Sequence, residues 1–252
     1  MKNIITVKDL NYRPFNNLNI QIKENSFVAI SGPNNSGKTT LMRILNREKG
    51  NNFPITILGK NISNHKISNY RKIVEALFPL EITFNELTLN DEINSIDKSI
   101  SSEYILKKLN LKKIGDIEFT KLDIKTLILS KLAIILLNNP QIIIIDELNL
   151  CFSHQEIIKI MDFLREYQHT YETTIIYTTT NLEDTIGLDY LYIISDGKII
   201  LEGEPLNTLQ KDNIINKIGL RIPFMIDLSV KLKDYNLLSD LELDPEGMVD
   251  KL

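Results

Sequence analysis

The chain has 252 residues, of which 43% are hydrophobic and 25% charged, and its formal net charge is -4 at pH 7. A chain of this length buries a substantial core, which predicts one main domain with at most a small appendage. The composition is ordinary for a globular protein and lacks the basic surplus that binds phosphate backbones, so no nucleic acid partner is expected.

Three further features bear on the location of the protein. The apolar runs at 132–137 and 142–145 are far shorter than the roughly 20 residues that span a bilayer. The N-terminal segment MKNIITVKDL lacks the apolar stretch and cleavage site of a secretory signal. Cys151 is the only cysteine, which excludes an intrachain disulfide. We therefore expect a cytoplasmic protein without a membrane-spanning segment.

The N-terminal part of the chain predicts short strands. Within residues 4–30, the apolar segments ITV, NLNIQI and FVAI are separated by Asn, Pro and Lys, a pattern typical of strands in a sheet. The last of them ends at Ser31. A glycine-containing loop follows, and then TTLMRILN places Leu41, Ile44 and Leu45 at helical spacing.

The loop between this strand and helix, residues 32–39, reads GPNNSGKT and matches G-x-x-x-x-G-K-[ST] in full. Such a loop curls its backbone N–H groups around a phosphate, its lysine reaches the β- and γ-phosphates, and its Thr hydroxyl binds Mg²⁺. Lys38 and Thr39 take these two roles. The residues predicted to bind ATP are Gly32, Pro33, Asn34, Asn35, Ser36, Gly37, Lys38, Thr39 and Thr40.

Residues 62–139 are rich in Asn, Ile and Lys and are mostly helical by pattern. The clearest segments are SEYILKKLNL and KTLILSKLAIILLNN, the second of which ends at Pro140. We interpret this range as a helical insertion.

The run QIIIIDE at 141–147 predicts a strand that is buried on both faces of a parallel sheet. Asp146 lies at its end, where a carboxylate can hold Mg²⁺ through water; a helix cap or turn residue is the alternative interpretation. Glu147 follows and is the candidate general base that polarises the attacking water. The predicted catalytic residues are thus Glu147 and Lys38, and the predicted metal ligands are Thr39 and Asp146.

Strand and helix alternate in the second half of the chain, which predicts an α/β core. SHQEIIKIMDFLREYQ reads as a helix, TTIIYTT as a buried strand and NLEDTIG as a helix. YLYIISDGKIILEGEP predicts a hairpin that turns at Asp196-Gly197. After Pro205 the sequence is again helical, with an apolar stripe of Ile226, Val230 and Leu237.

These segments resemble the ATP-binding cassette family and, within it, the ATP-binding subunits of energy-coupling factor importers. The resemblance covers VKDLNY, the loop at 32–39, LFPLEITFNELTLNDEI, NNPQIIIIDE, ISDGKIILEGEP and the tail GLRIPFMIDLSVKLKDYNLL. It implies a P-loop NTPase fold with an N-terminal antiparallel β subdomain, a parallel-sheet core, a helical subdomain at about 62–139 and a small C-terminal helical domain. The implied boundaries are 1–215 for the ATP-binding domain and 216–252 for the C-terminal domain. A generic amphipathic helix that covers the core is the alternative for the tail.

Several positions depart from the family pattern. The LSGGQ signature falls on Leu122–Thr126, which reads LDIKT and has neither glycine. The family's Gln that contacts Mg²⁺ and the membrane partner falls on Pro79, its phosphate-contacting His on Thr180, and its SALD-like stretch reads LNLCFS. The aromatic residue that stacks on adenine is either Tyr12 or Phe15.

In this family two subunits pair head to tail, and each ATP lies between one P-loop and the other subunit's LSGGQ. The resemblance therefore implies a heterodimer with a second ATPase that supplies an intact LSGGQ. It also implies a transmembrane coupling subunit that docks near residues 79–92, a substrate-binding membrane subunit, and a peripheral location at the cytoplasmic face of the membrane. Mg-ATP binding with slow hydrolysis is expected; a catalytically inactive scaffold or regulatory subunit of an ATPase partner is the alternative.

Overall fold

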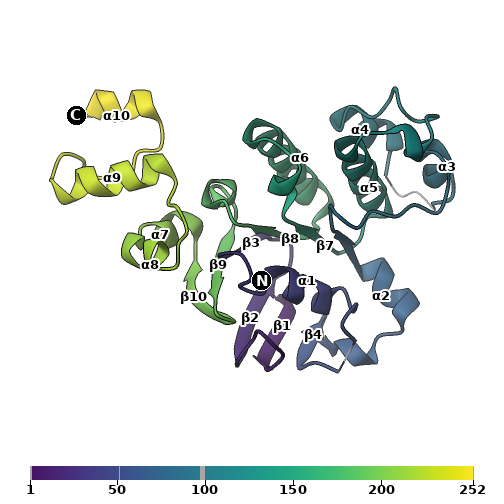
Figure 1. Ribbon diagram of the computed structural model, residues 1–252, viewed down its shortest axis with the longest axis horizontal. Coiled ribbons are helices and arrows are strands. Elements are labelled where there is room, and N and C mark those ends of the chain that lie inside the picture. Colours follow the sequence, from purple (N-terminus) through teal and green to yellow (C-terminus); the bar gives the residue numbers. More distant parts are fainter. Residues whose placement is uncertain (1, 51, 97–99, 252) are drawn as a thin grey trace.

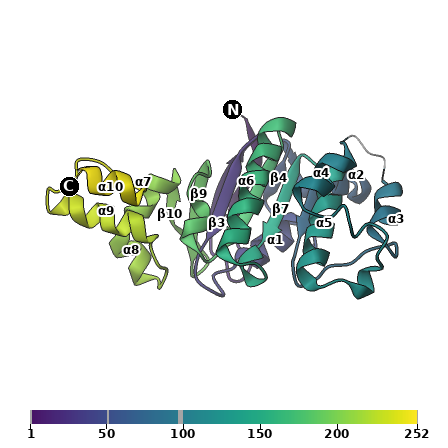
Figure 2. The same cartoon turned by 90° about the horizontal axis from the view of Figure 1, so that it is seen from above.

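The computed structural model of the protein describes residues 2–50, 52–96 and 100–251. Its centre is a sheet that lies between two peripheral groups of helices (Figure 1). In the view from above, α3, α4 and α5 lie at one end of the molecule and α8, α9 and α10 at the other (Figure 2). The fold is α/β, as the sequence predicts.

Two sheets form within the described residues. The larger has six strands in the order β10-β9-β3-β8-β7-β6, and the smaller has four in the order β2-β1-β4-β5. In the larger sheet β6, β7, β8, β3 and β9 are parallel, and β10 is antiparallel to β9. Its strands are β3 (Phe27–Ser31), β6 (Val74–Leu77), β7 (Ile142–Asp146), β8 (Thr174–Thr179), β9 (Tyr190–Ser195) and β10 (Lys198–Gly203).

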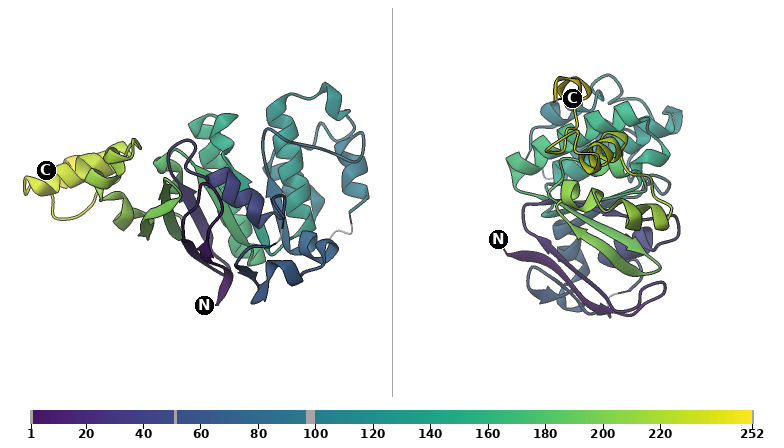
Figure 3. Two further views of the ribbon diagram at one scale, coloured as in Figure 1. Left: turned by 60° about the horizontal axis from the view of Figure 1, so that its bottom comes forward. Right: turned by 90° about the vertical axis from the view of Figure 1, so that its left-hand side faces the viewer.

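The smaller sheet is antiparallel throughout. Its strands are β1 (Asn3–Leu10), β2 (Leu18–Lys23), β4 (Ile55–Ile57) and β5 (Lys60–Asn61). Figure 3 shows this sheet as a layer of its own beside the larger one, with the C-terminal helices far from it. This is the N-terminal antiparallel layer that the family resemblance implies.

The run of isoleucines in β7 is explained by two cores, one on each face of the larger sheet. Ile143 and Ile145 belong to a cluster that includes residues of α5 (Ile124–Asn138) and α6 (His154–Tyr171). Ile142 and Ile144 belong to a second cluster with α1 (Lys38–Leu45) and the smaller sheet. Because successive side chains of a strand point to opposite faces, a strand between two cores must be apolar at every position.

The prediction that residues 62–139 form a helical insertion is wrong for one segment. β6 pairs in parallel with β7, so residues 74–77 belong to the core sheet. A four-residue apolar run carries no decisive periodicity, and the neighbouring strand determines its conformation. The helical elements of this range are η1 (Ile62–Asn64), α2 (Ile67–Ile73), α3 (Leu89–Asn94), α4 (Ser102–Lys108), η2 (Phe119–Lys121) and α5.

The remaining predicted elements of the second half are found with small differences. The hairpin of β9 and β10 turns at Asp196-Gly197 as predicted. The predicted helix at NLEDTIG is only a 3-10 turn, η4 (Leu182–Thr185), because Ile186 is already extended and Gly187 adopts a positive φ of 79°.

The C-terminal helices are α7 (Pro205–Leu209), α8 (Asp212–Lys217), α9 (Phe224–Asp234) and α10 (Pro245–Lys251). The predicted apolar stripe holds in part: Ile226 is buried and Val230 packs against the core cluster. Leu237 lies beyond the end of α9 and is 54% exposed, so it does not continue the stripe. None of the helices in the described parts of the chain has the length and apolar character needed to cross a bilayer.

The carboxyl group of Glu75 in β6 makes stability depend on pH. Burial raises its pKa to about 7, although the side-chain amide of Asn138 donates to it at 2.6 Å. Ionising a group whose folded-state pKa is raised destabilises the folded state, and this cost appears as pH rises from the unfolded-state pKa toward 7. Glu75→Gln should therefore raise the free energy of unfolding at pH 8, by up to about 3 kcal/mol, and by much less at pH 5. Chemical denaturation at both pH values measures this difference.

Glu202→Gln, a change at an exposed carboxyl group of β10, is the matched control and should shift stability far less. An equal gain for Glu75→Gln at pH 5 and pH 8 would contradict the explanation.

Candidate active site

The predicted site residues meet where three neighbouring parallel strands end. β8 lies between β3 and β7, and Thr178 of β8 is level with both Ile30 and Asp146. The loop at 32–37 leaves the end of β3 and leads into α1. The carboxyl ends of adjacent parallel strands are the usual place for a binding crevice in an open α/β sheet.

Two glycines allow the loop its close packing. Gly32 has φ 156°, and a Cβ there would lie 2.1 Å from the carbonyl oxygen of Ile194. Gly37 has φ 107°, and a Cβ there would meet side-chain atoms of Pro14 and Phe15 at 2.7 and 2.8 Å. Any side chain at either position would push the loop away from its neighbours.

Lys38 is nearly buried and already held in place. Its ammonium group donates to the carbonyl oxygens of Gly32 at 2.9 Å and Pro33 at 3.1 Å. It also forms an ion pair with Glu147, with 3.0 Å between Nζ and Oε1. The structure thus brings the two predicted catalytic residues together, 109 positions apart in the sequence (147 minus 38).

Asp146 joins the loop to β8. Its carboxylate accepts hydrogen bonds from the hydroxyls of Thr39 at 2.8 Å and Thr178 at 2.5 Å. Burial raises the pKa of Asp146, and the two hydroxyl hydrogen bonds oppose that shift. The predicted metal ligands Thr39 and Asp146 are therefore in contact with each other.

These oxygens suit a hard cation such as Mg²⁺, which takes oxygen ligands and keeps several waters. Within the residues that the structure describes, no group of three or more His, Cys, Asp or Glu side chains could hold a metal ion. The hydroxyl of Thr39 and the carboxylate of Asp146 are the two oxygen groups that meet here.

Glu147 holds its position through an unusual backbone conformation. Its φ is 42° and ψ 58°, the left-handed region that non-glycine residues seldom adopt. Its N–H donates to the carbonyl oxygen of Thr178 at 3.1 Å, which ties this conformation to β8. Strain of this kind costs of order 1 kcal/mol or more and is typical of functional sites.

The loop itself fits an anion. Asn34 and Asn35 are exposed at its outer bend, whereas Ser36 and Lys38 are buried. Ser36 Oγ is buried without a hydrogen-bond partner among the described residues. α1 begins at Lys38 directly after the loop, so the positive end of its dipole lies next to the loop.

The residues at the signature position, Leu122–Thr126, form the start of α5. Asp123 is the N-cap, and its carboxylate accepts from the N–H and the hydroxyl of Thr126 at 3.0 and 2.7 Å. These hydrogen bonds lower the pKa of Asp123. A carboxylate therefore caps the positive end of this helix.

Two other departures from the family pattern are located by the structure. Pro79 lies in the turn just after β6. Thr180 follows β8, and its hydroxyl accepts from the side-chain amide of Asn149 at 3.1 Å. The sequence did not predict a role for Asn149 or Thr178, although both lie within two residues of a predicted position. Their hydrogen-bond partners lie about 30 residues away in the chain, so no local pattern marks them.

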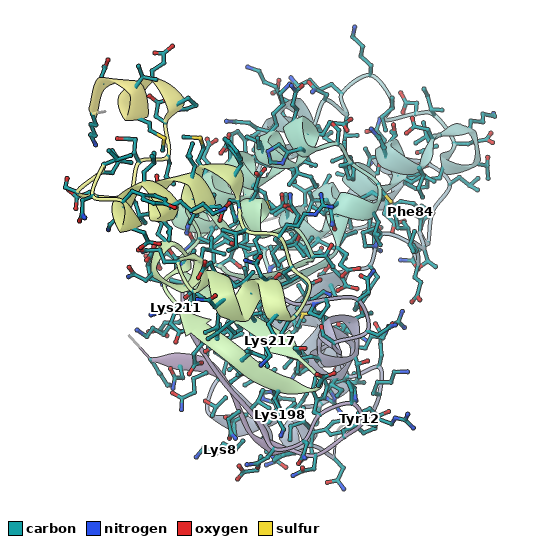
Figure 4. All side chains as sticks on the ribbon, turned by 60° about the vertical axis from the view of Figure 1, so that its left-hand side comes forward. Lys8, Tyr12, Phe84, Lys198, Lys211 and Lys217 are labelled. Atoms are coloured by element: carbon teal, nitrogen blue, oxygen red, sulfur yellow. The ribbon has the colours of Figure 1, made fainter. Side chains whose placement is uncertain are left out.

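Only one of the two aromatic candidates for an adenine contact is accessible. Phe15 is 5% exposed and packs against the loop at Gly37. Tyr12 is 38% exposed and lies at the periphery of the molecule (Figure 4), edge to face with Phe53 at a centroid distance of 5.4 Å. Phe53 was not among the predicted residues.

The sequence model of the family described as ABC transporter matches residues 15–149. Among curated relatives, the energy-coupling factor transporter ATP-binding protein EcfA of Pediococcus pentosaceus is 25% identical and covers 96% of this chain and 94% of its own length. EcfA1 of Bacillus subtilis is 26% identical, with coverages of 97% and 92%.

Solved structures have the same fold. CbiO1 from Clostridium perfringens, described as part of the ABC transporter complex cbiONQ, has a TM-score of 0.73 at 22% identity and covers 90% of this chain and 99% of its own. A nucleotide-free ATP-binding cassette from an ABC transporter has a TM-score of 0.72 at 20% identity, with coverages of 87% and 100%. These similarities confirm the P-loop NTPase fold that the resemblance implies.

Asp146→Asn tests whether this carboxylate supports a metal ion. The amide oxygen can still accept a hydrogen bond from Thr39, but the charge that attracts a divalent cation is lost. We expect the variant to lose most of the increase in ATP affinity that Mg²⁺ produces, measured by titration calorimetry with and without Mg²⁺. Asp189→Asn, at the opposite end of the sheet where Asp189 accepts from the N–H of Phe27, should keep the full Mg²⁺ effect. An unchanged Mg²⁺ effect in Asp146→Asn would argue against a metal at this carboxylate.

Proposed function

The chain belongs to the ABC transporter family, and from that premise we propose that it is the ATP-binding subunit of an importer of the energy-coupling factor type. It would bind Mg-ATP and couple binding and slow hydrolysis to transport as the degenerate half of a heterodimer. One observation carries this proposal: Lys38, Glu147 and the pair Thr39–Asp146 meet at one edge of the sheet. The EcfA relatives, similar over more than nine-tenths of both chains, support the importer class.

The ion pair suggests how ATP would change the site. A triphosphate brings negative charge to the loop, and Lys38 would exchange part of its contact with Glu147 for the β- and γ-phosphates. Glu147 would then be free to polarise a water for attack on the γ-phosphorus, with ADP and phosphate as products. Mg²⁺, when bound, would neutralise phosphate charge beside Thr39 and Asp146.

The start of α5 supports a heterodimer. In a head-to-tail pair this surface would face the partner's ATP, and the Asp123 carboxylate there would repel a γ-phosphate. A second copy of this chain would therefore offer a poor surface to both nucleotides, whereas a partner with an intact glycine-rich signature would complete the site at Lys38. Thr180 stands where the family has a charged side chain that contacts the phosphate. This supports slow turnover, because the loss of one such charge stabiliser typically lowers the reaction rate 10²- to 10³-fold.

The segment at 79–92 supports docking of a transmembrane coupling subunit. Leu80 and Leu87 are each 73% exposed. The buried carboxylate of Glu92 accepts the N–H groups of Asn85 and Glu86 at 3.0 and 2.8 Å, which holds the segment in one shape. An ordered loop with two outward leucines fits an apolar helix of a membrane partner. It would place the protein at the cytoplasmic face of the membrane, beside a separate substrate-binding subunit.

Leu87→Asp tests the docking surface. A charge in an apolar contact costs its desolvation, so the variant should copurify with the membrane subunits at less than about one-tenth of the native yield. Ile67→Asp, at a residue of α2 that is 52% exposed, is the control and should copurify normally. Equal recovery of both variants would place the docking surface elsewhere.

The isolated chain should bind Mg-ATP but show almost no ATPase activity, because Asp123 occupies the position that an intact signature would fill. Addition of the partner ATPase should restore turnover, measured as phosphate release. Brisk hydrolysis by the purified single chain would refute the heterodimer.

The alternative is an inactive ATP-binding scaffold or regulatory subunit of an ATPase partner, which Pro79, Thr180 and the acidic cap of α5 favour. Glu147→Gln in the assembled complex distinguishes the two. If this site drives transport, the variant should still bind ATP and lose at least about 10²-fold in ATPase rate. Unchanged ATPase and transport would favour the scaffold.

A further inference from the structure

Three buried side-chain polar atoms have no hydrogen-bond partner in the described part of the chain: Ser36 Oγ, Ser130 Oγ and Asn149 Oδ1. Ser36 belongs to the loop at 32–37, and Asn149 follows Glu147 by two residues. Buried polar atoms without partners are rare, and each one calls for a physical explanation. Two of the three lie beside the candidate site.

The side-chain amide of Asn149 has one partner, the hydroxyl of Thr180, and one atom without a partner among the described residues. With Nδ2 at 3.1 Å from Thr180 Oγ1, the amide donates to the hydroxyl and Oδ1 lacks a donor. A 180° rotation of the carboxamide lets the Thr180 hydroxyl donate to Oδ1 instead and turns the NH₂ group to the side where Oδ1 now has no partner.

The Asn149–Thr180 hydrogen bond lies next to the catalytic pair. Asn149 is in η3 (Leu148–Leu150), which begins directly after Glu147. Thr180 is two residues beyond Thr178, which accepts the N–H of Glu147 and donates to Asp146. The bond therefore links the segments after β7 and β8 just beyond the contacts that hold Asp146 and Glu147.

The charge of the neighbourhood selects the ligand atom. Lys38 and the start of α1 attract an anion at this edge of the sheet, where they lie beside the carboxylates of Asp146 and Glu147. An amide NH₂ group can donate to a phosphate oxygen, whereas the amide oxygen would repel it. The orientation with the NH₂ group free is therefore the one that phosphate binding would select.

We propose that Asn149 donates its side-chain NH₂ to a terminal phosphate oxygen of bound ATP, and that Thr180 positions Asn149 by hydrogen bonding to its amide oxygen. The pair distinguishes ATP from ADP, since ADP lacks the γ-phosphate. This inference rests on the proposed binding of ATP. In this proposal Asn149, a neutral residue, contacts the γ-phosphoryl group of ATP.

The test compares ATP and ADP affinities of the full-length chain by titration calorimetry with Mg²⁺. Asn149→Ala should weaken ATP binding by about tenfold, the value of one hydrogen bond to a charged group. Asn149→Asp keeps the shape but cannot donate, and should weaken ATP binding by more, about 10²-fold. ADP affinity should stay within about twofold for both variants, which shows that they are folded.

Thr180→Val removes the positioning hydroxyl and should lower the ratio of ATP to ADP affinity, and Thr180→Ser should restore it. Ser130→Ala, at the unpartnered hydroxyl in the middle of α5, is the matched control and should leave the ratio unchanged. A native ratio in Asn149→Asp, or equal losses for ATP and ADP in Asn149→Ala, overturns the assignment. If the native chain binds neither nucleotide, the proposed function itself fails.

Discussion

The parallel register of β3, β8 and β7 is the constraint on which the rest of the site depends. It places Thr178 level with both Ile30 and Asp146, so the loop after β3 and the carboxylates after β7 emerge side by side. Backbone hydrogen bonds between buried strands set this register, and a slip by one residue would turn Asp146 into the core. Separate cores cover both faces of the sheet.

The loop at 32–37 and the start of α5 differ in how their charges are paired. Lys38 is paired with Glu147, and Asp146 accepts hydrogen bonds from Thr39 and Thr178, so the charges and hydroxyls there are already paired. At the start of α5, by contrast, the helix dipole is satisfied within the chain by Asp123. A dipole that is already paired has little attraction left for a phosphate. The loop at 32–37 and the start of α5 therefore differ in their capacity to bind anions.

Polar contacts tie the helical region to α6 and bear on how the two move together. Lys125 Nζ lies 2.8 and 2.7 Å from the carboxylate oxygens of Glu156 at the start of α6, and the hydroxyl of Tyr104 donates to Glu166 at 2.8 Å near its end. Exposed pairs of this kind contribute about 0 to 1 kcal/mol each, so they can exchange without unfolding either part. The start of α5 is thus linked to the helix that follows Glu147.

The sequence by itself determined what depends on neighbouring residues: the loop at 32–39, the strand that ends at Asp146, the hairpin at Asp196-Gly197 and the α/β alternation. These patterns can be identified from the sequence because each one specifies its own backbone geometry or burial within a few residues. Only the tertiary structure decided that residues 74–77 join the sheet, that Phe15 is buried against Gly37, and that Asn149 bonds Thr180. Each of these depends on a partner about 20 to 70 residues away in the chain, and no local periodicity or motif records which distant strand or loop will lie alongside.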